Sequence, residues 1–360
     1  MPSKIVHRIE RELGMAGLVD ALASKLNASD LRSIMMEVFR ARAAGVQAAG
    51  IWAQSARDPL MAPSTVSARD LMVFDSAAFQ AAPEFVALDL SPLCPFAAAS
   101  TLGGTSQNNV VTAIRNAEAL GDPTIALALE AGRRRHSADV VRLCASHRVI
   151  RLQPFEAPGY SPHFRLFGLV TAGRDSGSFH FESLHLLEHV RVYLRLFRML
   201  NGAGFAFQNP LVEFADMVAV EAALAAAGVT RDEVRQSVRA HRLGGSQGFL
   251  RERGIAMPDV EYPQLASEVI APLRDEFPEA QFRVNQQRLE GLGYYRSFTL
   301  RISPEAPGGT RYPIVDGGFT DWTARLLGSR KERLLISGIG SEFACRTYLP
   351  RASCAPAPEG

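Results

Sequence analysis

The sequence predicts an α+β protein with a mostly antiparallel sheet flanked by helices. Segments with strand character fall into two groups, separated by a stretch rich in alanine, glutamate and arginine, and glycine or proline bounds the strand-like runs. A parallel doubly wound fold would need regular alternation of strands and helices, which the sequence lacks. The glycine pairs Gly103-Gly104 and Gly244-Gly245 also lack the context of phosphate-binding loops. The order of elements therefore favours helix, strands, helical insertion, strands.

The composition is that of a globular protein with a large core. Of 360 residues, 47% are hydrophobic and 21% are charged, and 39 basic against 37 acidic residues leave a formal charge of +2. This balance does not attract nucleic acid or an anionic membrane. The four cysteines are scattered, without zinc-ligand spacing, and the N-terminus lacks the apolar stretch of a signal peptide. We expect a cytoplasmic protein that does not bind a membrane.

The N-terminal half is predicted to begin with helices. Ser29 and Asp30 precede apolar residues at helical spacing, which predicts a long helix with one buried face from Leu31 toward Trp52. Residues 58–106 are predicted to be loop-rich with brief strands, and the apolar run 123–130 is predicted to be a strand followed by a helix.

Later segments carry clearer patterns. Residues 149–152 and 164–171 are predicted to be antiparallel strands joined by a proline-rich loop, and residues 180–200 a helix. Thr230 and Glu233 fit a capping box. Three further strands are predicted at 294–302, 312–315 and 333–340. The predicted organisation is a core of residues 1–211 and 281–349, a helical insertion at 212–280, and a flexible tail at 350–360.

The segment around Arg151 resembles motif 2 of class II aminoacyl-tRNA synthetases. It reads Ile-Arg-Leu-Gln153, then a loop rich in proline and glycine, then His163-Phe-Arg-Leu-Phe167. In that family the arginine grips the α-phosphate of ATP, the cation of the loop reaches the γ-phosphate, and the phenylalanine stacks on adenine. The resemblance implies these roles for Arg151, His163 and Phe167.

Further segments resemble the histidyl type of that family, in the same order along the chain. Glu290-Gly-Leu-Gly-Tyr-Tyr295 resembles the RGLDYY signature, Asp316-Gly-Gly-Phe-Thr-Asp321 resembles the GGRYD segment, and Gly338-Ile-Gly-Ser-Glu342 resembles the start of motif 3. Leu127 to Glu130 resembles the LRPE strand, whose acid holds the amino group of the substrate. The resemblance implies a class II aminoacyl-tRNA synthetase-like core.

The resemblance also assigns site residues. The implied catalytic residues are Arg151 and Arg346. The implied substrate-binding residues are Glu130, Gln153, Tyr294, Tyr295, Gly317 and Gly318. The implied nucleotide-binding residues are His163, Phe167 and Glu342. The resemblance implies ATP with Mg²⁺ as the cofactor. No zinc is expected, and no residues are assigned as metal ligands.

Departures from the family weaken the expected chemistry. Glu290 replaces the arginine of RGLDYY, Phe343 replaces the arginine of motif 3, and Gly293 replaces the aspartate that recognises imidazole. Adenylation needs fixed cations at the phosphates, and one such donor contributes about 3 kcal/mol. Arg346, one helical turn after Phe343, is a substitute within reach. Ordinary histidine activation is therefore not expected.

Two functions remain open. The first is a tRNA-independent paralogue that binds an amino acid or similar small acid, with or without ATP, and joins it to another acceptor. The alternative is a non-catalytic regulatory subunit with a protein partner, such as that of ATP phosphoribosyltransferase. The chain ends shortly after motif 3, so we expect no specific charging of tRNA. A homodimer is expected from the family, with the helix from Leu31 as its interface.

Two other patterns have less specific interpretations. His185-Leu-Leu-Glu-His189 fits the HxxEH spacing of a zinc peptidase, but its polar positions also fit a solvent-facing stripe, which we favour. The segment from Gln107 to Glu118 is rich in amides, which either satisfy their own backbone or line a pocket.

Overall fold

The computed structural model describes residues 4–153, 161–240 and 245–350. An eight-stranded sheet forms the centre of the molecule, in the order β1-β5-β6-β11-β10-β9-β7-β8. The pairs β1/β5 and β7/β8 are parallel and the other neighbours are antiparallel. A second, three-stranded sheet has the order β2-β4-β3. The predicted α+β class with a mostly antiparallel sheet is confirmed.

The strands are β1 (Val86–Ala87), β2 (Leu93–Pro95), β3 (Thr112–Ala113), β4 (Ala117–Ala119), β5 (Val140–Ile150), β6 (His163–Arg174), β7 (Gln208–Asp216), β8 (Gln281–Val284), β9 (Phe298–Glu305), β10 (Val315–Thr320) and β11 (Glu332–Gly340).

The helices are α1 (Lys4–Leu13), α2 (Leu18–Asp20), η1 (Ala21–Lys25), α3 (Ala28–Ala44), α4 (Ala48–Arg57), α5 (Ala68–Ala81), α6 (Ala98–Gly103), η2 (Gln107–Asn109), α7 (Pro123–Arg134), α8 (His180–Gly202), α9 (Met217–Ala226), α10 (Arg231–Ala240), α11 (Gly245–Glu252), η3 (Leu265–Ile270), α12 (Ala271–Glu276), α13 (Trp322–Leu327) and α14 (Ser341–Tyr348).

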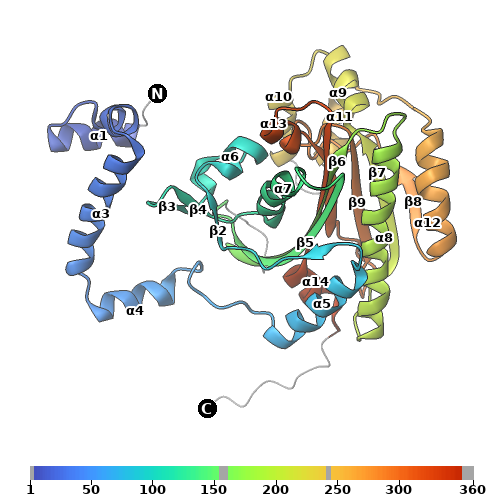
Figure 1. Cartoon of the computed structure of the whole chain (residues 1–360), viewed down its shortest axis with the longest axis horizontal. Helices are drawn as coiled ribbons and strands as arrows, with labels where there is room; N and C mark the ends of the chain where they lie inside the picture. Colours follow the sequence, from blue (N-terminus) through green and yellow to red (C-terminus); the bar gives the residue numbers. More distant parts are fainter. Residues whose placement is uncertain (1–3, 154–160, 241–244, 351–360) are drawn as a thin grey trace.

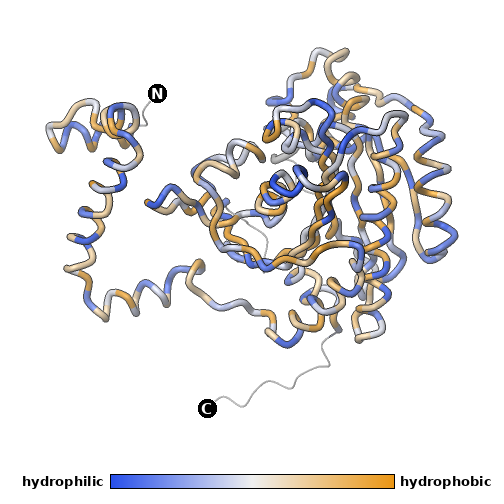
Figure 2. The backbone as a smooth tube through the Cα atoms, in the orientation of Figure 1, coloured by the Kyte–Doolittle hydropathy of each residue, from blue (hydrophilic) through white to orange (hydrophobic). Residues whose placement is uncertain are grey.

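The large sheet has a hydrophobic core on each face. On one face α5, α8, η3, α12 and α14 bury side chains such as Phe74, Val190 and Tyr348. On the other face α7, α9 and α13 cover the sheet with side chains such as Leu127 and Trp322. Figure 1 shows α8 and α12 on one side of the strands and α7 on the other, and in Figure 2 apolar runs concentrate in the strands between them.

The N-terminal helices lie apart from this body. Figure 1 shows α1, α3 and α4 as an arc beside the sheet, and none of their residues is buried. The predicted long helix with a buried face is therefore wrong in two respects. The chain breaks it between Ala44 and Ala48, where Gly45 ends α3, and its apolar side chains, such as Phe39 and Trp52, are exposed. A homodimer that covers these residues stays a prediction.

Two segments have a different secondary structure from the prediction. Residues 58–106 contain the long helix α5, and its apolar positions pack on the sheet. Residues 123–130 form the first two turns of α7 rather than a strand. Asp122 accepts hydrogen bonds from the backbone N–H and the hydroxyl of Thr124, and proline occupies the first helical position. An N-cap followed by proline starts a helix, and this local signal outweighs the apolar run.

Other predicted elements are confirmed with shifted ends. The strand at 164–171 lies within β6, and α8 covers 180–200. Of the strand predicted at 149–152, residues 149–150 end β5, which begins at Val140 and pairs with β6 along its length. The Thr230–Glu233 capping box is present, with the Thr230 N–H donating to the Glu233 carboxylate at 2.9 Å. Residues 212–216, predicted to open the helical insertion, are instead part of β7 in the large sheet. Residues 294–297 and 312–314 precede β9 and β10 rather than belonging to them. Most of the proline-rich loop and of the C-terminal tail lies outside the described residues.

The polar positions of α8 face the core rather than solvent. Glu182, His185 and His189 are all buried, which contradicts the predicted solvent-facing stripe. His189 interacts through Nδ1 with the Ser337 hydroxyl at 2.7 Å and through Nε2 with the Thr171 hydroxyl at 3.0 Å. Strand hydroxyls satisfy the buried imidazole, so the helix tolerates polar residues on its inner face.

Acidification is expected to destabilise the fold through His189. Burial lowers the pKa of His189 to about 3 from the ordinary 6.5, with a smaller contribution from His185. The folded protein therefore binds the proton less tightly than the unfolded chain, and stability is lost as the pH falls below 6.5. Below pH 6, the unfolding free energy of the wild type should fall with decreasing pH by up to about 1.4 kcal/mol per pH unit more than that of His189→Gln. Urea titrations between pH 7 and 4.5 measure this difference, and parallel profiles would contradict it.

Candidate functional site

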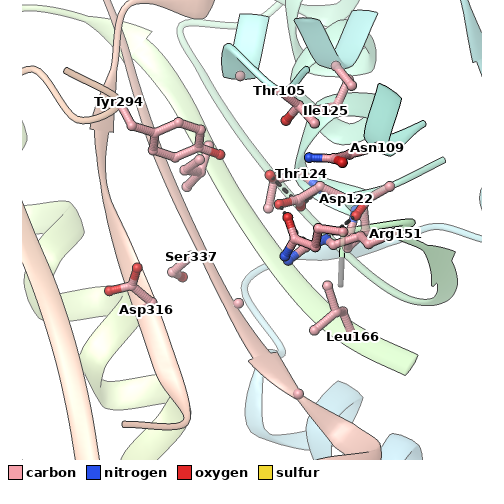
Figure 3. Close-up of a pocket in the computed structure, with 18 of the residues that line it drawn as sticks. Thr105, Asn109, Asp122, Thr124, Ile125, Arg151, Leu166, Tyr294, Asp316 and Ser337 are labelled. Carbon is pink, nitrogen blue, oxygen red and sulfur yellow. Dashed lines mark hydrogen bonds and ion pairs between the residues drawn. The ribbon is translucent and has the colours of Figure 1, made fainter. Parts of the chain in front are cut away.

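A cavity of about 400 Å³, the central cavity, opens on the face of the sheet that carries α7. Residues from η2, the N-terminal end of α7, β5, β6, β10, β11 and the turn before β9 line it (Figure 3). Its polar side chains come from Thr105, Asn109, Asp122, Thr124, Arg151, Gln153, Tyr294, Asp316 and Ser337. Polar groups from segments far apart in sequence thus converge on a concave space, as in small-molecule sites.

An aspartate and an arginine form one wall. Arg151, just after β5, donates its Nε to the Gly121 carbonyl at 2.7 Å and its Nη2 to the Asp122 carboxylate at 3.2 Å. Asp122 also caps α7 through Thr124. Both charged side chains remain about 30% exposed, at 32% for Arg151 and 27% for Asp122. The pair is therefore fixed in place but open to a ligand.

The opposite wall comes from the turn before β9 and from β10. Burial, and then the charge of Asp122, raise the pKa of Tyr294 well above its ordinary value, so its phenol stays protonated. Asp316 accepts a hydrogen bond from the Tyr295 phenol at 3.2 Å and pairs with Arg288 at 2.5 Å. The Arg288 side chain is only 2% exposed, whereas that of Asp316 is 50% exposed. A buried cation thus supports a carboxylate that faces the cavity.

The amide-rich segment forms the third wall. Thr105 and Asn109 line the cavity, and the Asn109 carbonyl accepts the N–H of Leu152 at 3.1 Å. Glu118 on β4 is fully buried and holds the segment together, as an acceptor for the N–H groups of Ala97 and Ala99 and for other donors. The two interpretations of this segment both hold: some amides satisfy local structure, and others line a pocket.

The structure brings part of the predicted site together. Arg151, Gln153, Tyr294 and Tyr295 all line the central cavity. Gly317 and Gly318 lie on β10 beside it, and their missing side chains leave room for Ser337 and for the Tyr295 ring. Packing therefore accounts for glycine at these two positions.

Two predicted contacts are absent from the cavity. Glu130 lies in the last two turns of α7 and pairs with Arg133 and Arg134, which lower the pKa of its carboxyl. Phe167 is fully buried against Phe79 of α5, on the opposite face of the sheet. Side chains alternate along a strand, and Leu166 is the residue of β6 that lines the cavity. The structure therefore does not bring Glu130 and Phe167 to the central cavity.

The other predicted nucleotide contacts also lie elsewhere. Arg148 of β5 joins His163 at 2.9 Å and Glu342 at 2.5 Å, and His163 contacts the Ala62 carbonyl at 2.7 Å. This cluster fastens the linker before α5 to the sheet. Neither His163 nor Glu342 lines the central cavity, and Arg346 on α14 does not line it either.

Asp122 and Thr124 line the central cavity although the family resemblance does not assign them to the site. The acid that ends an extended segment and opens on the cavity is Asp122, eight residues before Glu130. Its signal was the sequence Asp122-Pro-Thr124, an N-cap with proline behind it. A helix that starts at the edge of a sheet places its N-cap side chain at the mouth of the neighbouring cavity.

The central cavity holds few charges. Among the described residues that line it, Arg151 is the only cation, and Asp122 and Asp316 are the only anions. In the described part of the chain no group of histidine, cysteine, aspartate or glutamate side chains is arranged to hold a metal ion. No described helix is long and apolar enough to span a membrane.

The antiparallel sheet, the strand pair β5/β6 that carries Arg151, and the cavity above them define the catalytic-core fold of class II aminoacyl-tRNA synthetases. Solved structures of the histidyl type, which the sequence suggested, match this fold. A histidine–tRNA ligase subunit from Alicyclobacillus acidocaldarius superposes with a TM-score of 0.58 at 12% identity, over 80% of this chain and 95% of the other.

Two more solved structures show the same fold. An ATP phosphoribosyltransferase regulatory subunit/histidyl-tRNA synthetase from Bacillus halodurans has a TM-score of 0.57 at 13% identity, over 81% of this chain and 82% of the other. A chain of the ATP phosphoribosyl transferase (HisG:HisZ) complex from Thermotoga maritima has a TM-score of 0.50 at 13% identity, over 77% and 98%. No protein-family model and no curated protein matches the sequence. At these identities the similarity establishes the fold.

Proposed function

We propose that this protein is a tRNA-independent class II synthetase paralogue that binds an amino acid in the central cavity. The observation that supports the proposal is the Asp122–Arg151 pair in the cavity wall, with Tyr294 and Asp316 opposite. A carboxylate and a guanidinium side by side offer complementary contacts to the two charged groups of an α-amino acid.

Asp122 is the proposed contact of the amino group. The resemblance to the synthetases implies an acid at the end of an extended segment for this role, and Asp122 occupies that place. Arg151 is the proposed contact of the carboxylate, because its Nε and Nη2 donate to Gly121 and Asp122 while no described residue accepts from its Nη1. Tyr294 and Tyr295 supply the aromatic surface for the side chain.

ATP and Mg²⁺ are a separate part of the proposal. The resemblance to motif 2 implies a phosphate contact for Arg151, which lines the central cavity, but His163, Phe167, Glu342 and Arg346 do not line it. Amino-acid binding is therefore the proposed function, and Arg151 is the one cation among the described lining residues that a phosphate could contact. ATP–pyrophosphate exchange with each amino acid tests adenylation: exchange above background would establish it, and no exchange with any amino acid would exclude it.

Binding is expected to depend on Asp122. Loss of a charge-assisted hydrogen bond costs about 1.5–3 kcal/mol, so Asp122→Asn should weaken the best-bound amino acid by roughly 10- to 100-fold. Calorimetric titration of the twenty amino acids identifies that ligand and measures the change. Asp321→Asn is the matched control, because Asp321 pairs with Arg296 and lies outside the central cavity. Equal affinity of wild type and Asp122→Asn would exclude the proposed contact.

A regulatory subunit is the second candidate. The fold similarity to the regulatory subunit and to the HisG:HisZ complex favours it, as does the scarcity of cations in the central cavity. Mixing the protein with an ATP phosphoribosyltransferase catalytic subunit tests this function. Complex formation with a change in the rate of that enzyme would support it, and neither effect would exclude it.

A further inference from the structure

A second cavity of about 560 Å³, the distal cavity, adjoins the central one. The two share Gly103, Thr105, Asn109, Gln153, Gly291 and Tyr294 as lining residues. Asp122 and Arg151, the proposed contacts of the amino and carboxylate groups of a free amino acid, line the central cavity and not the distal one. The distal cavity is therefore unused by the proposed ligand.

The inserted segment supplies a charged residue to the distal cavity. Arg231, the first residue of α10, lines it, and the Thr230–Glu233 capping box fixes the start of that helix. The side chain of Arg231 crosses Gly293, where its Cδ lies 3.4 Å from the position that a Cβ atom would take. Gly293 has a φ of +75°, which favours glycine, so the turn leaves open the space that Arg231 occupies.

Arg231 and Glu290 are the only charged residues among the described lining of the distal cavity, and their surroundings differ. Burial acts to raise the pKa of Glu290. The positive charges of Arg301, which pairs with it at 3.4 Å, and of Arg288 act to lower it, and the pKa is lowered overall. Two cations thus compensate Glu290. Among the described residues Arg231 has one carboxylate partner, Glu221 at 2.7 Å, and its side chain is 51% exposed. The guanidinium therefore has more N–H donors than this one ion pair uses.

The wall between the cavities is suited to an amide. Among described residues, neither the Asn109 nor the Gln153 side chain has a hydrogen-bond partner, although both face the cavities. A side-chain amide offers both a donor and an acceptor, which is the complement of a peptide group. The hydroxyl of Thr105 lies on the same wall. This is the amide-rich segment that the proposed amino-acid contacts do not involve.

From this arrangement we infer that the two cavities together form a site for an amide-linked ligand of dipeptide size. The inference rests on the proposed function for its first contact, the amino group at Asp122. The amide group then lies against Asn109 and Gln153, and the terminal carboxylate reaches Arg231 in the distal cavity. Arg231 is a specificity-determining residue that selects dipeptides over single amino acids.

The test compares twenty amino acids with the twenty dipeptides in which each is followed by alanine. Calorimetric titration should give at least one dipeptide that binds tenfold or more tightly than its own amino acid. Converting the C-terminal carboxylate of that dipeptide to an amide should remove the advantage. Arg231→Gln should weaken the free dipeptide by roughly 10-fold and leave both the dipeptide amide and the single amino acid unchanged.

Arg253→Gln is the matched control. Its side chain is similarly exposed, at 49%, and pairs with Glu233 of the same insertion, but it does not line the distal cavity. This variant should bind the dipeptide as the wild type does. Dipeptides that bind no more tightly than amino acids, or a loss that is equal for the acid and the amide, would overturn the inference and leave the proposed function intact. Absence of binding by both series would overturn both.

Discussion

Replacing Glu118 with alanine is expected to unfold the small sheet and the helix α6 beside the cavity. The carboxylate is fully buried and accepts the N–H groups of Ala97 at 3.0 Å and Ala99 at 2.8 Å, and the Gln107 amide at 3.1 Å. Each buried donor left without a partner costs about 1–3 kcal/mol, so the variant should lose on the order of 3–5 kcal/mol. Hydrogen exchange of residues 93–119, followed by mass spectrometry, measures where the loss occurs.

Glu118→Gln is the informative companion to this variant. Glutamine keeps the shape and one oxygen acceptor, so it should lose less than alanine does. Because Thr105 follows α6 and Asn109 ends η2, Glu118→Ala should also weaken ligand binding. Uniform destabilisation across the whole chain, rather than faster exchange confined to 93–119, would show that this region does not open separately.

The sequence was sufficient for the class of fold because its strongest signals are local. Strand runs bounded by glycine or proline predicted β6 and β11 within a few residues, and the capping box at Thr230 located α10, whereas only the last two residues of β5 were predicted. The central cavity is lined by Arg151, which follows a strand end, and by Tyr294 and Tyr295, which lie in a glycine turn. At both places the backbone itself borders the cavity, so a local sequence pattern was enough to locate these residues.

The sequence did not predict the directions in which certain side chains point, because these depend on contacts between residues far apart in the chain. Phe167 matched the spacing of an adenine-stacking residue, but the register of β6 turned it toward α5 and left Leu166 in the cavity. One position along a strand reverses the face of every side chain. His189 looked like a surface residue because nothing in its own helix reveals the hydroxyl of Ser337, which lies 148 residues away in the chain.

The charged residues around the central cavity differ from those that the resemblance to the synthetases implies. The position of the RGLDYY arginine holds Glu290, which pairs with Arg301 instead of lining the central cavity, and Phe343 packs on Tyr312 rather than supplying a cation. Arg288 lies behind Asp316 and is buried, so its charge supports the wall rather than a phosphate. The polar groups that face the cavity suit an amine and a carboxylate better than a triphosphate.

Gly317 is expected to be the least replaceable glycine of the large sheet. It pairs with Ser337 between β10 and β11, and a Cβ atom there would lie 2.5 Å from the Ser337 Cβ and 2.6 Å from the Ile336 carbonyl oxygen. Because part of the obstruction is backbone, the strands must separate, and Gly317→Ala should lose at least about 3 kcal/mol of unfolding free energy. Denaturant titration of the free protein measures the loss.

The same experiment separates packing from ligand contact as the reason for this glycine, which the family resemblance assigned to substrate binding. Gly202→Ala is the control, because no atom lies within 4 Å of the position its Cβ would take and a helical alanine should stabilise by about 0.5–1 kcal/mol. If packing is the reason, Gly317→Ala loses stability without any ligand present. A variant as stable as the wild type that fails to bind would instead assign Gly317 to the ligand. The first result is the expected one, because the Ser337 side chain that would have to move away from the new Cβ is held by hydrogen bonds of its hydroxyl to both His189 and Tyr193.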